Sequence, residues 1–369
     1  MQKKLGASAL AIAAVAAASL GGTGTASATG IESLTSGSLP LITFATPTGS
    51  MEGPSRQHQE ANTRRNTFGL RFMSMPPALG LTGGSLEDGT TTAWRPSGGL
   101  FGMSAGDKWS PGVTFWGGVS YASTENDFAA TAFDDDTYSL SAGVDKKFGK
   151  FTVGLYASAS VSDTESSFNG GSSNTTTLTM GPYLNYQLND MFRFEVNLGG
   201  NVGEVDNRRV AGAAVITGNQ DTAGWFASGA ANIDHWIGNF GLNGRLGYLF
   251  ADSKNSPYVD STATAIAGVE SHFEQLQVSG QVSYYVGGSS GVGFLPYIKA
   301  EYLYDISREE LRTAPGTLQP ANDRDEIVLG AGFSVFSDGP ISGGLSFTKG
   351  FARDQFDNWS LSGNVSYAF

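Results

Sequence analysis

Apolar and polar residues alternate along most of this chain beyond residue 112. The last segment shows the pattern clearly, because one parity is apolar apart from a single glycine and the other is small or polar. The apolar parity consists of Trp359, Leu361, Gly363, Val365, Tyr367 and Phe369. Successive side chains of a β-strand point to opposite faces, so this period of two predicts a strand with one apolar face.

Twelve segments carry this alternation and predict an all-β fold. They cover residues 113–121, 138–144, 151–161, 178–188, 192–198, 225–233, 240–250, 276–284, 294–302, 327–335, 341–347 and 359–369. An uncovered terminal strand would invite aggregation, so the last segment needs a neighbour on each side. The first segment and the segment at 341–351 are the predicted neighbours, and this pairing closes the sheet into a barrel.

The connections between the segments alternate in length. Short turns are expected at 149, 189–190, 238–239, 287–291 and 338–339. Long polar loops are expected at 123–136, 162–174, 204–221, 252–271 and 305–324. Short turns at one end and long loops at the other, joining an even number of amphipathic strands, are typical of a transmembrane β-barrel.

A soluble sandwich or barrel would show the same alternation, with its apolar parity facing a core. Two features favour a membrane instead. Aromatic residues lie near strand ends, where they would meet the lipid boundary; these are Tyr121, Tyr138, Tyr186, Phe250, Tyr284, Tyr304 and Phe369. The opposite parity is rich in Ser, Thr, Asn and Gln, which suits a wet lumen. Residues 111–369 are therefore predicted to form a twelve-stranded antiparallel transmembrane β-barrel.

The composition argues against several classes of function. The chain has no cysteine, 51 glycines in 369 residues and a net charge of -12. Without cysteine there is no disulfide framework and no thiolate chemistry. The low number of basic residues argues against nucleic acid as a partner. No cofactor is expected.

The first 28 residues predict a secretory signal peptide. Lys3 and Lys4 precede an apolar run that extends to about Leu20, and Ala26-Ser27-Ala28 offers small residues where a signal peptidase cuts. A transmembrane anchor is the alternative, but the run is short and rich in alanine. No later stretch has the roughly 18 apolar residues that a membrane-spanning helix needs.

The barrel region resembles the autotransporter β-domain of type V secretion. The stretches that carry the resemblance are residues 134–158, 177–188 and 294–305, together with the aromatic terminus. The resemblance implies a barrel in the outer membrane of a Gram-negative bacterium that brings an N-terminal passenger to the cell surface. It also implies contact with outer-membrane lipid, the barrel-assembly machinery and periplasmic chaperones. Leu361, Gly363, Val365, Tyr367 and Phe369 then resemble the C-terminal signal that this machinery reads.

The stretch left for a passenger is short. Residues 29–110 begin as a segment rich in Gly, Ser, Thr and Pro, which indicates a linker, and they lack the repeats of a β-helical passenger. Self-cleaving members of the family cut between two adjacent asparagines in a lumenal helix. Asn62 and Asn66 are separated here, so no such cleavage is expected. Either the passenger is vestigial or the function lies in the barrel itself.

A lumenal helix is expected near residues 55–67, with a disordered linker as the alternative. Ser55 could cap the helix after Pro54, and the residues that follow are polar on every side. Such a helix is stable only where polar walls surround it. Its contacts would be Arg56, Arg64 and Arg65, and the partners expected on the lumen wall are Glu195, Glu301, Asp145 and Asp234.

The remaining candidate residues give weak signals for chemistry. The three histidines are His58, His235 and His272, and none stands in a convincing catalytic pattern, so the protein is not expected to be an enzyme. Asp134, Asp135 and Asp136 could bind a divalent cation, although a solvated loop tip is the preferred interpretation. The lumen-facing charges could tune ion passage or stabilise one another; they are Arg193, Glu195, Arg245, Lys299 and Glu301.

These patterns lead to one principal functional hypothesis. The chain is expected to translocate or display a reduced N-terminal passenger at the cell surface. The alternative is a stand-alone outer-membrane channel, or an adhesin that acts through its long loops. An outer-membrane hydrolase is a third candidate.

Overall fold

The computed structural model describes residues 113–128, 132–166, 170–189, 191–211, 214–237, 239–287, 292–307, 323–337 and 341–368. The long strands are β1 (Val113–Asn126), β2 (Phe133–Phe148), β3 (Phe151–Ser166), β4 (Gly171–Gln187), β5 (Phe192–Ala211), β6 (Ala214–Ile237), β7 (Phe240–Asn255), β10 (Val269–Tyr284), β12 (Val292–Ser307), β13 (Asp325–Ser337), β14 (Ile341–Phe351) and β15 (Phe356–Ala368). Three short strands accompany them, namely β8 (Tyr258–Val259), β9 (Ala265–Ile266) and β11 (Val286–Gly287).

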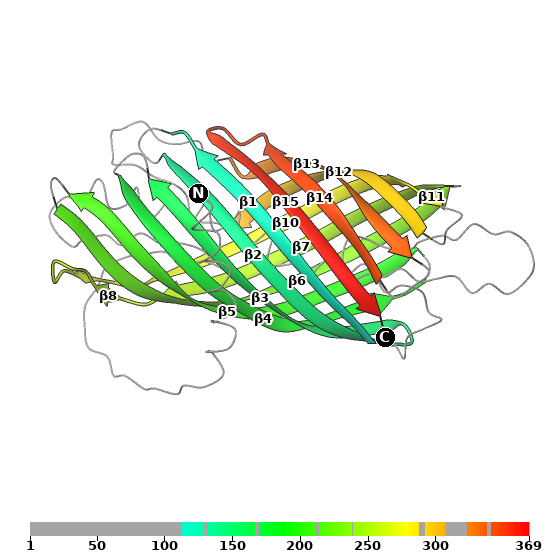
Figure 1. The fold of residues 1–369 in the computed structure, drawn as a ribbon, viewed down its shortest axis with the longest axis horizontal. Helices are drawn as coiled ribbons and strands as arrows, with labels where there is room; N and C mark the ends of the chain where they lie inside the picture. Colours follow the sequence, from blue (N-terminus) through cyan, green and yellow to red (C-terminus); the bar gives the residue numbers. More distant parts are fainter. Residues whose placement is uncertain are drawn as a thin grey trace, which may run out of the picture.

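The twelve long strands of these described ranges form one closed antiparallel barrel (Figure 1). Each strand pairs with the next along the chain, and β10 pairs with β12 across the loop that follows β10. The barrel closes where β1 pairs with β15, from Thr114 opposite Ala368 to Asn126 opposite Phe356. The predicted twelve-stranded barrel and its predicted closing pair are confirmed.

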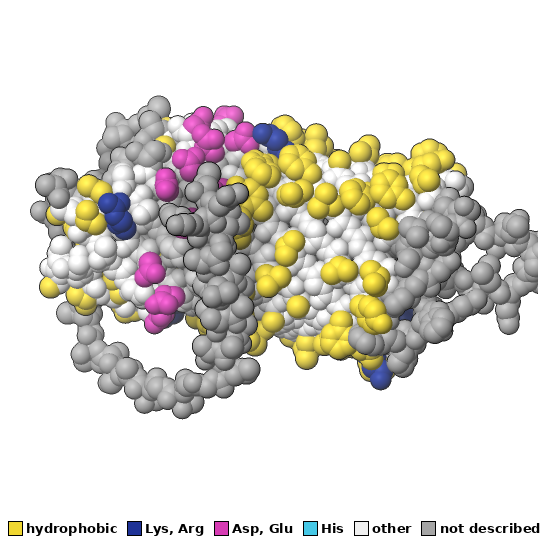
Figure 2. Space-filling view, viewed as in Figure 1, with side chains coloured by type: hydrophobic (Ala, Val, Ile, Leu, Met, Phe, Trp, Pro, Cys, Tyr) yellow, Lys and Arg dark blue, Asp and Glu magenta, His cyan; other side chains and the backbone are white. Residues whose placement is uncertain are grey.

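The barrel is apolar outside and polar inside. Large apolar side chains point outward and stay accessible, among them Leu155 at 61% and Ile298 at 66% exposure. Inward side chains are largely small and polar, as with Thr177 at 1% exposure. Figure 2 shows apolar side chains spread over much of one outer face, with acidic side chains gathered toward the end that carries β8. Such a surface matches a hydrocarbon solvent.

Aromatic side chains form a row at each end of this apolar surface. Toward the long-loop end, Tyr121 lies 5.0 Å from Tyr138 and 5.1 Å from Trp359 between ring centroids. Toward the short-turn end, Phe151 stacks on Tyr186 at 4.7 Å. The two rows match the interfacial girdles of membrane barrels. Within the described ranges, no helix is long and apolar enough to cross a membrane.

Several strands run further than their sequence pattern indicated. The expected loops at 162–174 and 204–221 were wrong, because β3, β4, β5 and β6 continue through most of these residues as paired strands. The physical reason is that the outer face here lies beyond the apolar surface and meets water. Polar residues then occupy both parities, and the alternation disappears although the backbone pairing continues.

Inward-facing glycines make room for aromatic side chains from neighbouring strands. A Cβ atom at Gly143 would overlap the Trp116 side chain, and one at Gly154 would overlap the Tyr183 ring. The lumen wall is therefore close-packed, and a bulky ring on one strand depends on a missing side chain on the next.

We predict that Gly154→Val destabilises the barrel by about 1–3 kcal/mol, because the added side chain must displace the Tyr183 ring. The matched control is Gly280→Val, since an added Cβ at Gly280 meets no atom within 4 Å. Urea unfolding of both variants in lipid vesicles measures the effect. Equal midpoints for the two variants would contradict the packing account.

Candidate functional site

The lumen wall carries a balanced charge network toward the short-turn end. Arg193 of β5 donates from Nε to Glu195 Oε1 at 3.2 Å, and its Nη1 lies 3.8 Å from Asp234 Oδ2 of β6. Arg245 of β7 pairs with the other oxygen of Glu195. Two arginines and two carboxylates leave no net charge, which limits the cost of burying these groups.

The other lumen-facing residues expected from the sequence lie on β12 and β2. Lys299 and Glu301 of β12 point to the same side of their strand, with Nζ and Oε2 separated by 2.9 Å. Asp145 of β2 accepts a hydrogen bond from the Tyr183 hydroxyl at 2.7 Å. Tyr183 in turn accepts one from Trp116 Nε1 at 2.8 Å. This chain of contacts links β1, β2 and β4 across the wall.

A second network lies at the long-loop end and was missed by the sequence reasoning. Arg353, in the turn between β14 and β15, reaches Asp305 Oδ2 of β12 and Glu326 Oε2 of β13, both at 2.7 Å. Gln275 of β10 donates to Asp305 at 2.7 Å. The Arg353 side chain is only 2% exposed. A lone arginine in a short polar turn gives no sequence signal of burial.

Strain in the same turn is compensated by these contacts. Ala352 and Gln355 both have a positive φ, of 69° and 67° respectively. Non-glycine residues adopt this region at a cost, and they keep it only where surrounding contacts require it. The two ion pairs of Arg353 hold the turn in this conformation.

The acidic run of β2 does not converge on one site. Asp135 points inward and accepts hydrogen bonds from the hydroxyls of Thr137, Ser162 and Thr164 at 3.1, 2.9 and 2.6 Å. Asp134 and Asp136 lie on the opposite parity, facing outward. The expectation of a loop tip was wrong, because β2 already begins at Phe133 and alternation separates the three carboxylates.

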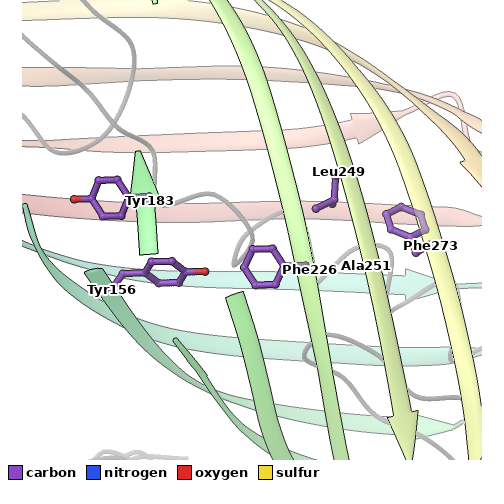
Figure 3. Close-up of a cluster of buried hydrophobic side chains, with 6 residues drawn as sticks. All are labelled: Tyr156, Tyr183, Phe226, Leu249, Ala251 and Phe273. Carbon is purple, nitrogen blue, oxygen red and sulfur yellow. The ribbon is translucent and has the colours of Figure 1, made fainter. Parts of the chain in front are cut away.

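Apolar side chains also enter the lumen. Figure 3 shows Tyr156, Tyr183, Phe226 and Phe273 projecting into the barrel from β3, β4, β6 and β10. Across the strands, Phe226 stands beside Ala251, and Ala251 beside Phe273. Large and small residues thus alternate along one row of the wall, so the interior is partly filled by side chains rather than fully open.

The two described histidines lie outside the lumen. His235 is on the outward parity of β6, close to the short turn at 238. His272 of β10 contacts Glu274 Oε1 at 2.8 Å, and its Nδ1 lies 3.9 Å from Asp252 Oδ2. Ser271 is on the inward parity, so it does not stand beside the imidazole.

The loop between β7 and β10 folds into a small platform. Its β8–β9 hairpin lies against the extension of β6, where Ser261 N donates to Thr217 O at 2.8 Å. Arg209 of β5 pairs with Asp260 at 2.7 Å. Burial opposes ionisation of Asp260, but hydrogen bonds from Thr262 and Arg209 outweigh it and hold the pKa of this carboxyl below its usual range.

Some predicted residues lie beyond the part of the chain that the structure describes. These are the signal peptide at 1–28, the segment at 29–110 with its expected helix near 55–67, and Arg56, His58, Arg64, Arg65 and Phe369. Of the C-terminal signal, Leu361, Val365 and Tyr367 point outward at 41%, 55% and 41% exposure. They lie on the lipid-facing surface of β15.

Comparison with known proteins gives a consistent picture. The family model described as the autotransporter beta-domain matches residues 115–348. A search of the curated proteins gives no significant match.

Solved structures share the fold at low sequence identity. The translocator domain of the autotransporter NalP from Neisseria meningitidis has a TM-score of 0.58 and 11% identity, covering 70% of this chain and 89% of that one. The β-domain of the Bordetella autotransporter BrkA gives 0.59 and 14%, covering 70% and 100%. The transport unit of AIDA-I from Escherichia coli gives 0.53 and 13%, covering 71% and 92%.

We predict that Glu195→Gln lowers the stability of the barrel by about 3 kcal/mol, because it leaves two buried arginines facing one remaining carboxylate. Unfolding by guanidinium in detergent measures the change. Glu270→Gln is the matched control, since it removes an ion pair with Lys254 that is largely exposed on both sides. A midpoint for Glu195→Gln as close to the parent as that of the control would contradict the role of the network.

Proposed function

The chain belongs to the autotransporter β-domain family, a barrel of the Gram-negative outer membrane, and from this premise we propose that it translocates or displays a reduced N-terminal passenger, drawn from residues 29–110, at the cell surface. The segment is a much reduced passenger, and the barrel translocates or displays it. The barrel contacts outer-membrane lipid through its apolar face.

The start of β1 is the observation that supports this proposal most directly. Val113 lies opposite Lys146, three residues before the short turn at Gly149, and Thr114 lies opposite Ala368 at the end of β15. Short turns face the periplasm in outer-membrane barrels. The chain therefore joins the barrel from the periplasmic end, and a segment displayed outside must pass through the lumen.

The chemistry of the lumen suits such a passage. Its wall is built mainly of Ser, Thr, Asn and Gly, and the charge network around Glu195 is internally balanced. Around this network the wall is neutral, so a passing polypeptide is not held there by strong ion pairs. The segment itself is rich in small polar residues, so it can move along such a wall.

We further propose that the helix near 55–67 rests in the lumen. Arg56, Arg64 and Arg65 would face the inward carboxylates, of which Asp145 contacts the neutral Tyr183 hydroxyl, whereas Glu301 already pairs with Lys299. The charge complementarity between the arginines and Asp145 supports this placement.

The barrel is proposed not to be an enzyme. His272 lies between two carboxylates on the outer surface, where Glu274 also accepts from the Tyr248 hydroxyl at 2.6 Å. Within the described ranges, the polar contacts of His272 are with carboxylates rather than with a serine hydroxyl, which a hydrolase needs as its nucleophile. The barrel-assembly machinery and periplasmic chaperones are the proposed assembly partners, and the outward side chains of β15 are the proposed signal.

A loop-mediated adhesin is the second candidate function. The β8–β9 platform favours it, because hydrogen bonds and the Arg209–Asp260 ion pair tie this loop to β6 and β5. An ordered outer surface is a better binding surface than a loop without internal contacts.

We predict that an epitope tag placed at residue 35 is removed by protease added to intact cells, while the barrel resists. The reason is that the proposed export carries the segment through the membrane but leaves the strands in lipid. Immunoblotting before and after opening the outer membrane measures it. A tag that is protected until the membrane is opened would favour a channel or loop-mediated function instead.

We predict that replacing Arg64 and Arg65 with Glu raises single-channel conductance in planar bilayers, because like charges would expel the helix from the lumen. Replacement of both by Lys is the control, since it keeps the charge. Unchanged conductance in the Glu variant would exclude a lumenal plug at these positions.

A further inference from the structure

Two exposed lysines at the short-turn end of the barrel have no carboxylate partner among the residues that the structure describes. Lys146 lies near the end of β2, and Lys150 lies in the turn between β2 and β3. Their contacts are with a phenylalanine ring and a backbone carbonyl oxygen, respectively. At the long-loop end, by contrast, Lys254 Nζ lies 2.7 Å from Glu270 Oε1.

Lys146 stands among residues that face lipid. It has the outward parity of β2, and in register it lies opposite Val113 of β1 and Val153 of β3. Val153 is 45% exposed, and Phe148, the next outward residue toward the turn, is 55% exposed. A charged group is costly in hydrocarbon, so a lysine at such a position extends its ammonium group to the interface.

The Lys146 side chain has this extended arrangement. Its Nζ lies over the Phe148 ring, 5.4 Å from the ring centroid. Phe148 is two residues nearer the turn, which is about 6.7 Å along the strand. The face of an aromatic ring attracts a cation. The ring therefore holds the ammonium group at the height of the aromatic row, where the lipid headgroups begin.

Lys150 places a second ammonium group beside the same row. Its Nζ donates to the Leu188 carbonyl oxygen at 2.7 Å, and an ammonium group has three donors, so two stay available. Phe151 lies opposite Phe148 on one side and Tyr186 on the other, and it stacks on the Tyr186 ring at 4.7 Å. The surface made by these two lysines and three rings is called the basic rim below.

The outer surface around the basic rim carries no carboxylate in the described ranges of β2 to β6. The described acidic residues toward this end of these strands are Asp145, Glu195 and Asp234, and each points into the lumen. On the face drawn in Figure 2, the visible acidic side chains gather toward the end that carries β8. An anion that balances the two lysines thus has to come from the surroundings of the barrel.

The chemistry of the basic rim specifies its ligand. Short turns face the periplasm, so the rim lies among the headgroups of the periplasmic leaflet. Its two ammonium groups offer charge and hydrogen bonds to a phosphate, and its exposed rings offer an apolar contact to acyl chains. A zwitterionic headgroup would find no carboxylate for its own cation, so the rim favours a headgroup with net negative charge.

We propose that the basic rim binds an anionic phospholipid of the periplasmic leaflet, with Lys146 and Lys150 contacting its headgroup. The site lies on the outer surface, so it does not depend on passage of the N-terminal segment through the lumen. A lipid bound there anchors the β2–β3 hairpin at the periplasmic interface.

Native mass spectrometry of the full-length barrel tests the proposal, with phosphatidylglycerol and phosphatidylcholine of identical acyl chains offered in equal amounts. The rim variant combines Lys146→Gln and Lys150→Gln. The matched control combines Lys254→Gln and Lys349→Gln, which removes the same charge from two ion pairs at the long-loop end. Parent and control are expected to prefer phosphatidylglycerol. The rim variant is expected to lose about 25-fold of this preference, about five-fold for each lysine.

A second variant covers the case in which the rim variant fails to fold. Phe148→Leu keeps both lysines and an apolar outward side chain, but it removes the ring beneath the Lys146 ammonium group. It is expected to lower the preference about two- to five-fold. Phe194→Leu on the outward parity of β5 is its control, because Phe194 lies opposite Tyr186 and contacts neither lysine, and it is expected to keep the preference.

Two results would overturn the proposal. An equal preference in the parent, the rim variant and Phe148→Leu would show that anionic lipid binds elsewhere on the barrel. No preference in the parent would leave the two lysines to a different anion, such as free phosphate or the acidic face of a periplasmic protein.

Discussion

The closing pair between β1 and β15 is the constraint on which the rest of this structure depends. Lipid offers no hydrogen-bond partner, so each backbone N–H and C=O group within it must be paired inside the protein. Thirteen residues of β1 stand opposite thirteen of β15 in unbroken register, which leaves no open sheet edge. Closure in turn determines that one parity of each strand faces lipid and the other faces a shared interior.

That interior is less like a water-filled tube than the sequence pattern implies. Rings from β3, β4, β6 and β10 fill part of it, and two charge networks tie its walls together at opposite ends. Between these features lies the neutral surface of β3 and β4. The interior therefore combines packed, charge-linked regions with a neutral region lined by hydroxyl groups.

The fold was largely predictable because contact with lipid requires the outward-facing residues of each strand, every second residue, to be apolar. Beyond the lipid this alternation is not required, and there the prediction from sequence was wrong. Glu204 and Asp206 lie on a paired strand beyond the apolar surface, whereas their polar sequence predicted a loop. The site was predictable only where a charge stood inside a clear strand, as for Arg193 and Glu195. Arg353 could not be found, because its burial depends on carboxylates contributed by β12 and β13, far away in sequence.

The paired extension of β5 and β6 beyond the apolar surface has a consequence for the direction of membrane insertion. Glu204, Asp206 and Arg208 lie on this hairpin, and their side chains are exposed on its outer face. To reverse its orientation, the finished barrel would have to draw these charges through hydrocarbon, at several kcal/mol for each. The charged hairpin therefore raises the free-energy barrier to reversal. Once it stands on the far side of the membrane, it fixes the orientation of the barrel.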